Sequence, residues 1–289
     1  NITGCVVSTN IYSTVGGDGT HGGFIANSAN STFSIEGCAY TGRLLTNKGT
    51  NNCGGFVGWS GDNTFTVTAS LYAPSGSIPE GWSAINAGAT FVRGNKSLTA
   101  TTCYLTEPMS DAQGWLVSAS TSAPANLGEA VENGNYGLLT AYANGILLDG
   151  TYYVTRVLNG AGTADNPYII ANDADWETFV NNVNNGNNCS GKFVRLEADI
   201  TVNETVGLRG DKPFSGTFLG NGKTITASIS STTSGTGSNE QGVAPFHYIS
   251  GATIRDLKVA GTIASASYHT AGLVGFADGT NLIEGCAVT

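Results

Sequence analysis

A short phrase recurs through this chain with its apolar and cysteine positions preserved. Three copies read Ile-x-Gly-Cys, at residues 2–5, 35–38 and 283–286, and a degenerate copy at 254–257 reads Ile-Arg-Asp-Leu. Neighbouring copies are separated by about 30 residues, a period typical of solenoids in which each repeat stacks on the next. The phrase therefore predicts a stacked-repeat protein.

A second phrase alternates with the first. It reads Gly-Gly-Phe-Ile at 22–25, Gly-Gly-Phe-Val at 54–57 and Ala-Gly-Leu-Val at 271–274. Between the phrases lie strand-like runs too short to be stable alone, which become stable when each coil pairs its backbone with the coils above and below. This pattern predicts a parallel β-helix. The glycines at Gly23, Gly55 and Gly272 fit tight corners, where a Cβ would clash or φ must be positive.

Residues of one repeat phase stack in a column along the axis of such a fold and face its core. We expect this core ladder to comprise Ile2, Ile35, Ile254, Ile283, Cys5, Cys38, Leu257 and Cys286. Cysteine behaves there as a small hydrophobe. Buried free thiols are therefore the leading interpretation of the six cysteines, and a disulfide between some of them stays open.

One segment has helical periodicity. We expect a short capping helix near 172–185, with Asn172 or Asp173 as its N-cap. Its apolar stripe consists of Trp176, Phe179, Val180 and Val183, at helical spacing. Such a helix would cover the open sheet edge at the start of the coils.

The order of the segments is unusual. Residues 1–72 carry β-helix coils, residues 73–160 lose the repeat phase, and residues 161–289 hold the helical cap and the first coils. We read 73–160 as irregular closing coils or a small β-rich annex. Because the opening of the solenoid lies in the second half of the chain, we expect 1–72 and 161–289 to belong to one continuous solenoid. That solenoid would form between neighbouring copies if the chain is a processed unit of a tandem array.

In such a tandem array, the first and last coils of each unit would present complementary unpaired sheet edges. These two edges predict self-association. Head-to-tail contacts of this kind need not close and can give filaments.

The composition narrows the classes of partner. The net charge is −9 and the 12 basic residues are scattered singly. Nucleic-acid binding requires clustered Lys and Arg, so it is not expected. No apolar run reaches the roughly 20 residues of a membrane span. The cysteines show no metal-ligand spacing, and we expect no metal or cofactor.

Several motifs resemble a known family. The runs Gly54-Gly-Phe-Val-Gly58 and Gly272-Leu-Val-Gly275 resemble the GLUG motif repeats of large bacterial surface proteins. The segments 162–170 and 214–225 are similar to the opening of such repeats. The resemblance implies a right-handed parallel β-helix in a secreted, cell-surface or adhesin-like protein, and it brings no catalytic residues.

An enzymatic alternative stays open. Glycoside hydrolysis needs two carboxylates about 5–9.5 Å apart, and the repeat phase offers Glu36 and Glu284. The loop around Asp18 and His21 is more simply a turn. The acidic residues at 173–177 suit a helix N-terminus better than a calcium site.

We therefore expect a non-enzymatic, extracellular structural or adhesive module that acts as a rigid stalk or filament unit. The alternatives are a carbohydrate-binding β-helix or a polysaccharide hydrolase or lyase, and a host-ligand module that uses 73–160. If exposed, Trp59, Trp82 and Trp115 could stack on the sugar rings of a glycan, but burial in the core or the annex is the favoured interpretation.

Overall fold

The computed structural model describes residues 1–61, 63–94, 98–208, 212–231, 242–267 and 269–289. The protein is all-β, with about eight turns of parallel β-solenoid, which confirms the predicted fold class. The chain divides into two compact units, residues 1–156 (unit 1) and 157–289 (unit 2). In the part of the chain that is described, no helix has the length and apolarity needed to cross a membrane.

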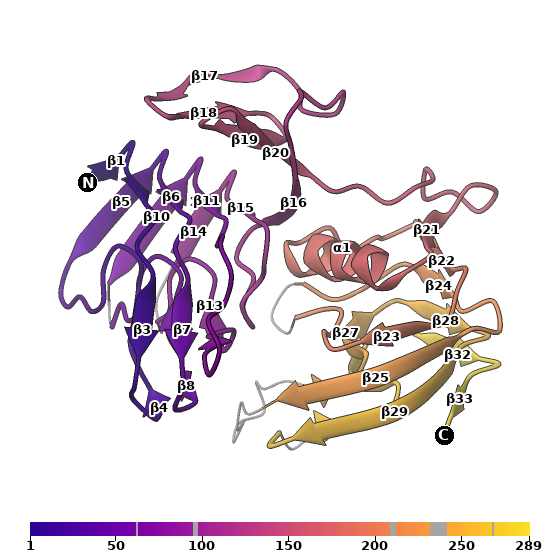
Figure 1. Ribbon diagram of the computed structural model, residues 1–289. Coiled ribbons are helices and arrows are strands. Elements are labelled where there is room, and N and C mark those ends of the chain that lie inside the picture. Colours follow the sequence, from indigo (N-terminus) through magenta and orange to yellow (C-terminus); the bar gives the residue numbers. More distant parts are fainter. Residues whose placement is uncertain (62, 95–97, 209–211, 232–241, 268) are drawn as a thin grey trace. The chain divides into compact units, whose positions relative to one another are not determined.

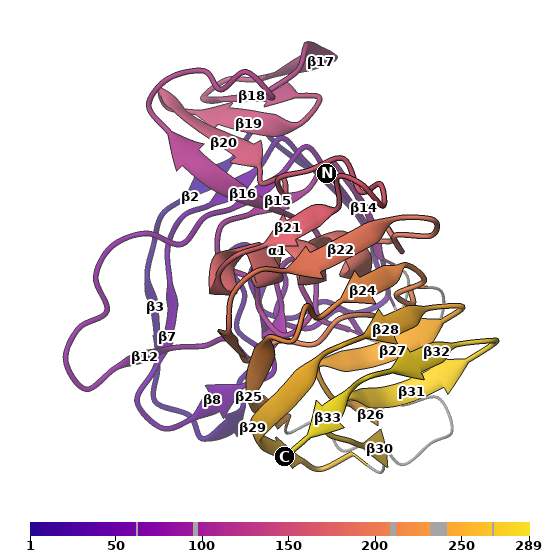
Figure 2. The same ribbon diagram turned by 90° about the vertical axis from the view of Figure 1, so that its right-hand side faces the viewer.

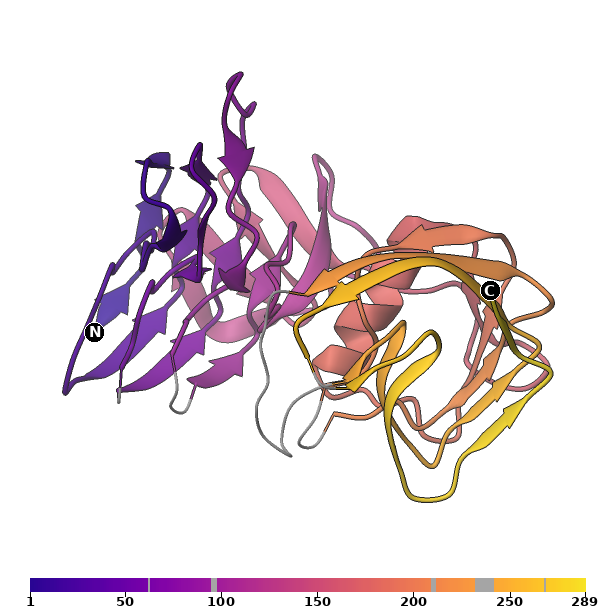
Figure 3. The same ribbon diagram turned by 90° about the horizontal axis from the view of Figure 1, so that it is seen from below.

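Successive coils of unit 1 contribute one strand each to parallel sheets, and Figure 3 shows these coils side by side, from indigo at the left to magenta. The first sheet has the order β1 (Ile2–Thr3), β5 (Thr32–Glu36), β10 (Thr64–Thr68) and β14 (Leu98–Thr101). Ile35 lies opposite Ile2 on one side and Val67 on the other. Side chains of one phase thus stack in columns, as the repeat predicted.

The remaining faces of unit 1 repeat this arrangement. The second sheet begins with β2 (Val6–Val7), β6 (Ala39–Tyr40), β11 (Leu71–Tyr72), β15 (Tyr104–Leu105) and β16 (Trp115–Ser120). A third contains β3 (Ile11–Ser13) and β7 (Leu44–Thr46), with β12 (Ser83–Ala84) added antiparallel. Short ladders join β4 (Gly17–Asp18) to β8 (Thr50–Asn51) and β9 (Cys53–Gly54) to β13 (Gly88–Ala89).

Aromatic side chains form stacked columns in this core. The rings of Phe33 and Phe65 are parallel, with centroids 4.9 Å apart. The ring of Phe56 lies 4.8 Å from those of Phe24 and Phe91. Residues one repeat apart therefore contact each other directly, which is what a coil-over-coil solenoid requires.

Residues 73–160 contain both coils and hairpins. The coils continue to β16, although the Ile-x-Gly-Cys phrase is lost there. The sheet then turns antiparallel through β20 (Thr151–Thr155), β19 (Gly145–Leu148), β18 (Leu139–Tyr142) and β17 (Ala130–Tyr136) (Figure 1). We call residues 117–156 the annex. It extends the second coil sheet of unit 1.

Unit 2 is built on the same plan. One sheet has the order β21 (Tyr168–Ile170), β22 (Phe193–Leu196), β24 (Thr217–Leu219), β28 (Thr253–Arg255) and β32 (Leu282–Glu284) (Figure 2). Another contains β23 (Ile200–Val202), β25 (Thr224–Ser231), β29 (Lys258–Ser265) and β33 (Ala287–Val288). Parallel pairs join β26 (Gly242–Val243) to β30 (His269–Thr270) and β27 (Phe246–Ser250) to β31 (Val274–Asp278).

Helix α1 (Asp173–Asn184) is the one helix among the described residues. Its N-cap is Asn172, whose side chain accepts a hydrogen bond from the Asp175 backbone N–H at 3.0 Å. The predicted apolar stripe is buried, and the Trp176 ring packs edge-on against Phe218 and Phe246. The helix therefore closes the hydrophobic core of unit 2.

The glycine of the first phrase has a specific backbone role. It adopts a left-handed conformation in each copy, with φ of +64° at Gly4, +59° at Gly37 and +65° at Gly285. Asp256 takes the same place in the degenerate copy, with φ of +53°. This residue turns the chain between two faces of the coil, a conformation that glycine adopts without steric cost.

The glycines of the second phrase have a different role. Gly23, Gly55 and Gly272 lie outside the left-handed region. A Cβ on Gly55 would lie 2.1 Å from the Thr90 carbonyl oxygen, and one on Gly272 would lie 2.3 Å from Val288 Cγ1. Close approach of the neighbouring coil, rather than positive φ, is therefore what requires glycine at these corners.

Candidate functional site

The core-ladder residues differ in burial according to the position of their coil. Ile35 and Ile254, in coils covered on both sides, are fully buried, whereas Ile283 in the last coil is 46% exposed. Cys38 is likewise buried, while Cys5 is exposed and Cys286 is half-buried. The same phrase is thus interior in the middle of a unit and surface-exposed at its end.

Each unit has a terminal coil whose strands are unpaired on their outer side. Within the described residues, β1 to β4 of unit 1 and β30 to β33 of unit 2 pair with a strand on one side only. Apolar side chains accompany these unpaired backbones: Leu282 is 42%, Val288 56% and Val6 36% exposed. Exposed edges of this kind are templates for pairing with another strand. They form the candidate interaction site of this chain.

The two open edges carry the same phrase in different units. None of the strand pairings among the described residues joins 1–72 to 161–289. That these ranges form one continuous solenoid therefore stays a prediction.

The two candidate carboxylates have structural partners. Glu36 Oε1 accepts a hydrogen bond of 2.8 Å from the Tyr136 hydroxyl of the annex. Burial of Tyr136, together with this bond, raises its pKa to about 12. Glu284 Oε2 lies 3.2 Å from Arg255 Nε. In register, Glu36 neighbours Thr3 and Thr68 and Glu284 neighbours Arg255. Each carboxylate thus serves a structural contact of its own unit.

The structure brings His21 to Ser13, a contact that the sequence analysis did not anticipate. His21 Nε2 is 2.8 Å from Ser13 Oγ, and a serine held by a histidine is the beginning of a nucleophilic constellation. Ser13 is only 3% exposed. Its oxygen also lies 2.8 Å from the Thr50 hydroxyl, which is in turn 2.8 Å from the Thr46 hydroxyl. These hydroxyls form a buried ladder between two coils.

An ion pair anchors the loop that contains His21. Asp18 accepts two hydrogen bonds from Arg93, of 2.7 and 2.9 Å, in a bidentate pair. The Arg93 guanidinium carbon lies 4.6 Å from the centroid of the Trp59 ring. One face of Trp59 is therefore covered by a cation.

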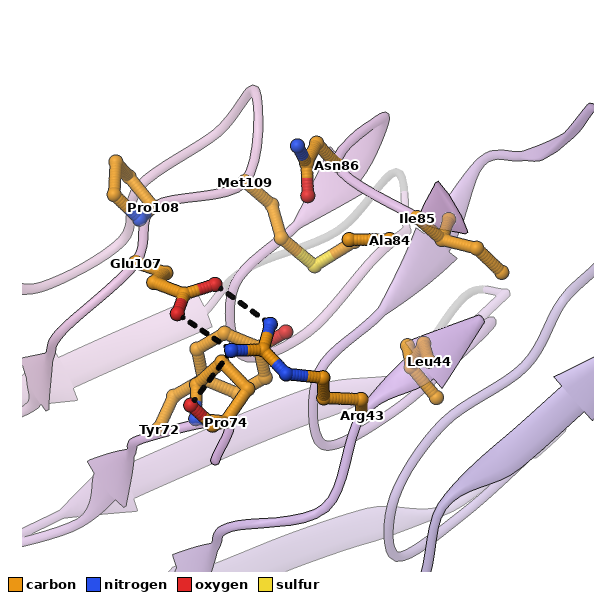
Figure 4. Close-up of a pocket in the computed structure, with 10 residues that line it drawn as sticks. All are labelled: Arg43, Leu44, Tyr72, Pro74, Ala84, Ile85, Asn86, Glu107, Pro108 and Met109. Atoms are coloured by element: carbon orange, nitrogen blue, oxygen red, sulfur yellow. Dashed lines mark hydrogen bonds and ion pairs between the residues drawn. The ribbon is translucent and has the colours of Figure 1, made fainter. Parts of the chain in front are cut away.

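A narrow depression in unit 1 is organised around Arg43 (Figure 4). Nη1 and Nη2 of Arg43 each donate to the Glu107 carboxylate at 2.9 Å. Nε donates to the Gly76 carbonyl at 3.0 Å, and Nη2 lies 3.4 Å from the Pro74 carbonyl. Arg43 thus holds the long loop before β12 against the coil that carries Glu107.

One aromatic pair stays partly open to solvent. The rings of Tyr12 and Trp82 meet edge to face at 4.8 Å, and Tyr12 is 48% exposed. Trp115, by contrast, packs against the apolar cluster beneath the annex. All three tryptophans singled out in the sequence are half-buried, and Trp82 is the one whose aromatic partner is exposed.

Two titratable groups of unit 2 have strongly shifted pKa values. Burial, reinforced by the charge of Glu177, raises the pKa of Glu204 to about 7. Burial lowers the pKa of His247 to about 4, and none of the described residues forms a hydrogen bond with its Nε2. Both lie outside the repeated phrases, so no periodic pattern predicted their burial; His247 is expected from the sequence to be an ordinary loop residue, whereas it lies buried in strand β27.

The acidic residues at the start of α1 cap backbone groups. Asp173 accepts a hydrogen bond from the Thr201 N–H and Asp175 accepts one from the Ala171 N–H, both at 2.9 Å. Across the described part of the chain, no group of three or more His, Cys, Asp or Glu is arranged to hold a metal ion.

No family model matches this chain, and neither a curated protein nor a solved structure matches it.

Proposed function

We propose that this chain is an extracellular structural or adhesive repeat module of a bacterial surface protein with GLUG-like repeats. It acts as a rigid spacer, and its copies join head to tail. The observation that carries the proposal is the exposure of one repeated residue, which is nil for Ile254 and 46% for Ile283. The equivalent position of the repeat is buried wherever another coil covers it.

The free energy of association would come from burying these edges. Full burial of an aliphatic side chain contributes about 1.5–3 kcal/mol, and Leu282, Ile283 and Val288 are each roughly half exposed. Pairing Ile2 of one copy beside Ile283 of another continues the columns seen inside each unit. The new backbone hydrogen bonds add specificity of register. The gain must exceed the entropy lost on association, so weak, concentration-dependent assembly is the expected behaviour.

Light scattering coupled to gel filtration, with electron microscopy of the same samples, tests the proposal. Elongated particles that lengthen with protein concentration are expected. Ile283→Asp should abolish them by placing a charge on the open edge. Thr66→Asp is the matched control, because Thr66 is an exposed residue within the central strand β10. A monomer at all concentrations, or equal effects of the two variants, would contradict head-to-tail assembly.

The Tyr12–Trp82 pair favours carbohydrate binding as a second candidate. An exposed aromatic edge of this kind can stack on a sugar ring. Quenching of tryptophan fluorescence by members of a polysaccharide panel, lost in Trp82→Ala but retained in Trp115→Phe, would support it. Release of reducing sugars from the panel would instead indicate a polysaccharide-processing enzyme, and Glu36→Gln would then test the carboxylate.

A further inference from the structure

Cys5 and Cys38 lie side by side on the first two coils of unit 1. Thr3 is in register with Glu36, and Val6 is in register with Ala39. The hydrogen bond from the Ala39 N–H to the Cys5 carbonyl, at 2.9 Å, continues this register through the turn. Cys5 is therefore the direct neighbour of Cys38.

The two thiols point the same way. Cys5 Sγ lies 3.4 Å from the Thr3 carbonyl oxygen, and Cys38 Sγ lies 3.3 Å from the Glu36 carbonyl oxygen, so each thiol contacts the carbonyl two residues before it. Neighbouring strands are about 4.8 Å apart, which falls within the roughly 4.4–6.8 Å between Cα atoms that a disulfide spans. Because the first coil is covered on one side only, it can move the small distance that bond formation requires.

We propose that Cys5 and Cys38 form a reactive thiol pair that low-molecular-weight disulfides, such as oxidised glutathione, convert into an intrachain disulfide. The exposed Cys5 thiolate attacks the glutathione disulfide, which forms a Cys5–glutathione bond and releases one glutathione thiolate. The Cys38 thiol then loses its proton and attacks the Cys5 sulfur. A second glutathione thiolate leaves, so two protein thiols are oxidised and one glutathione disulfide is reduced to two thiols.

The order of attack follows from exposure. Cys5 is exposed and Cys38 is buried. Burial raises the pKa of Cys38, and a side-chain hydrogen bond with Cys5 adds to this. Since the thiolate is the nucleophile, the second step should accelerate as pH rises. The resulting disulfide would cross-link the first coil of unit 1, which is covered on one side only, to the second coil.

The remaining cysteines provide internal controls. Cys286 is half-buried on an open coil, but its neighbour in the column is Leu257. Cys103 is buried and separated from Cys38 by Ser70, which occupies the intervening coil. Cys286 should therefore form a stable mixed disulfide with glutathione, and Cys103 should not react in the folded protein.

The experiment treats the whole folded chain, diluted until it is monomeric, with oxidised glutathione. The reaction is quenched with acid, the remaining thiols are alkylated under denaturing conditions, and the peptides are mapped by mass spectrometry. Cleavage after Glu36 and Arg43 places Cys5 and Cys38 in separate peptides. A cross-link between these two peptides is expected, with glutathione retained on Cys286. Stable glutathione on Cys5, or a cross-link from Cys5 to any other cysteine, would overturn the proposal.

Two variants sharpen the result. Cys38→Ser should leave Cys5 glutathionylated, and Ser70 already shows that a serine is accommodated in this column. Leu257→Cys places a thiol beside Cys286 and should convert its glutathione adduct into a disulfide. If Cys5 resists cross-linking while the new pair forms readily, the first coil lacks the required geometry and the proposal fails.

Discussion

Ile254 and Ile283 offer a matched test of the stacked columns, because they occupy the same position in neighbouring coils. Ile254 is fully buried and Ile283 is 46% exposed. Truncating a buried isoleucine to alanine typically destabilises a protein by about 2–5 kcal/mol, since a cavity is added to the lost transfer free energy. At Ile283 about half of the side chain already contacts water and no closed cavity forms. Ile283→Ala should therefore cost about 1 kcal/mol.

Urea unfolding of the dilute chain at fixed pH, followed by circular dichroism, measures the difference. We expect Ile254→Ala to lower the midpoint by about two to five times as much as Ile283→Ala, with an unchanged slope. Ile35→Ala in unit 1 should behave like Ile254→Ala, because Ile35 is also fully buried. Equal losses at Ile254 and Ile283 would refute the argument that the phrase is buried by its neighbouring coils.

Further predictions concern the phrase glycines and the buried ionisable groups. Gly37→Ala should destabilise the protein by several kcal/mol, because the new Cβ would lie 2.0 Å from the Tyr136 ring. In Gly49→Ala the new Cβ meets no neighbour, so this variant should lose only about 1 kcal/mol, from its positive φ. Similar losses of stability for the two variants in thermal unfolding would contradict this prediction. Glu204 has a pKa raised to about 7 in the fold, so folding is disfavoured increasingly as pH rises from about 4.5 to 7. Glu204→Gln should remove that penalty, up to about 3 kcal/mol at pH 8 and none at pH 4, and a pH-independent difference from the native chain would rule it out. The pKa of His247 is lowered to about 4, so its contribution to stability is lost as pH falls from about 6.5 to 4, and His247→Gln should flatten the unfolding profile over that range.

The periodic parts of the fold could be predicted from the sequence because one pattern determines both register and burial. The phrase at 2–5 and 35–38 predicted coil stacking, and Ile2 indeed lies opposite Ile35. The spacing from Trp176 to Val183 predicted a capping helix, and α1 buries that stripe. In both cases a single period places the large apolar side chains on one face.

The contacts that tie the periodic parts together have no period and could not be predicted. Glu36 and Tyr136 are far apart in the sequence, as are Arg43 and Glu107, and each pair forms only because a loop or the annex folds back. The left-handed turn in the first phrase was also missed. Its signal was present, since Gly and Asp are the residues found at that position in all four copies.

Hydrogen exchange of the open edges, measured at increasing protein concentration, tests the central claim most directly. If the terminal coils pair with those of another copy, backbone amides of β1, β2, β32 and β33 exchange rapidly in dilute solution and become protected together as the protein assembles. Amides of the central strand β10 should keep a constant rate. Concentration-independent exchange at all four edge strands would contradict the claim that these coils are binding surfaces for another copy.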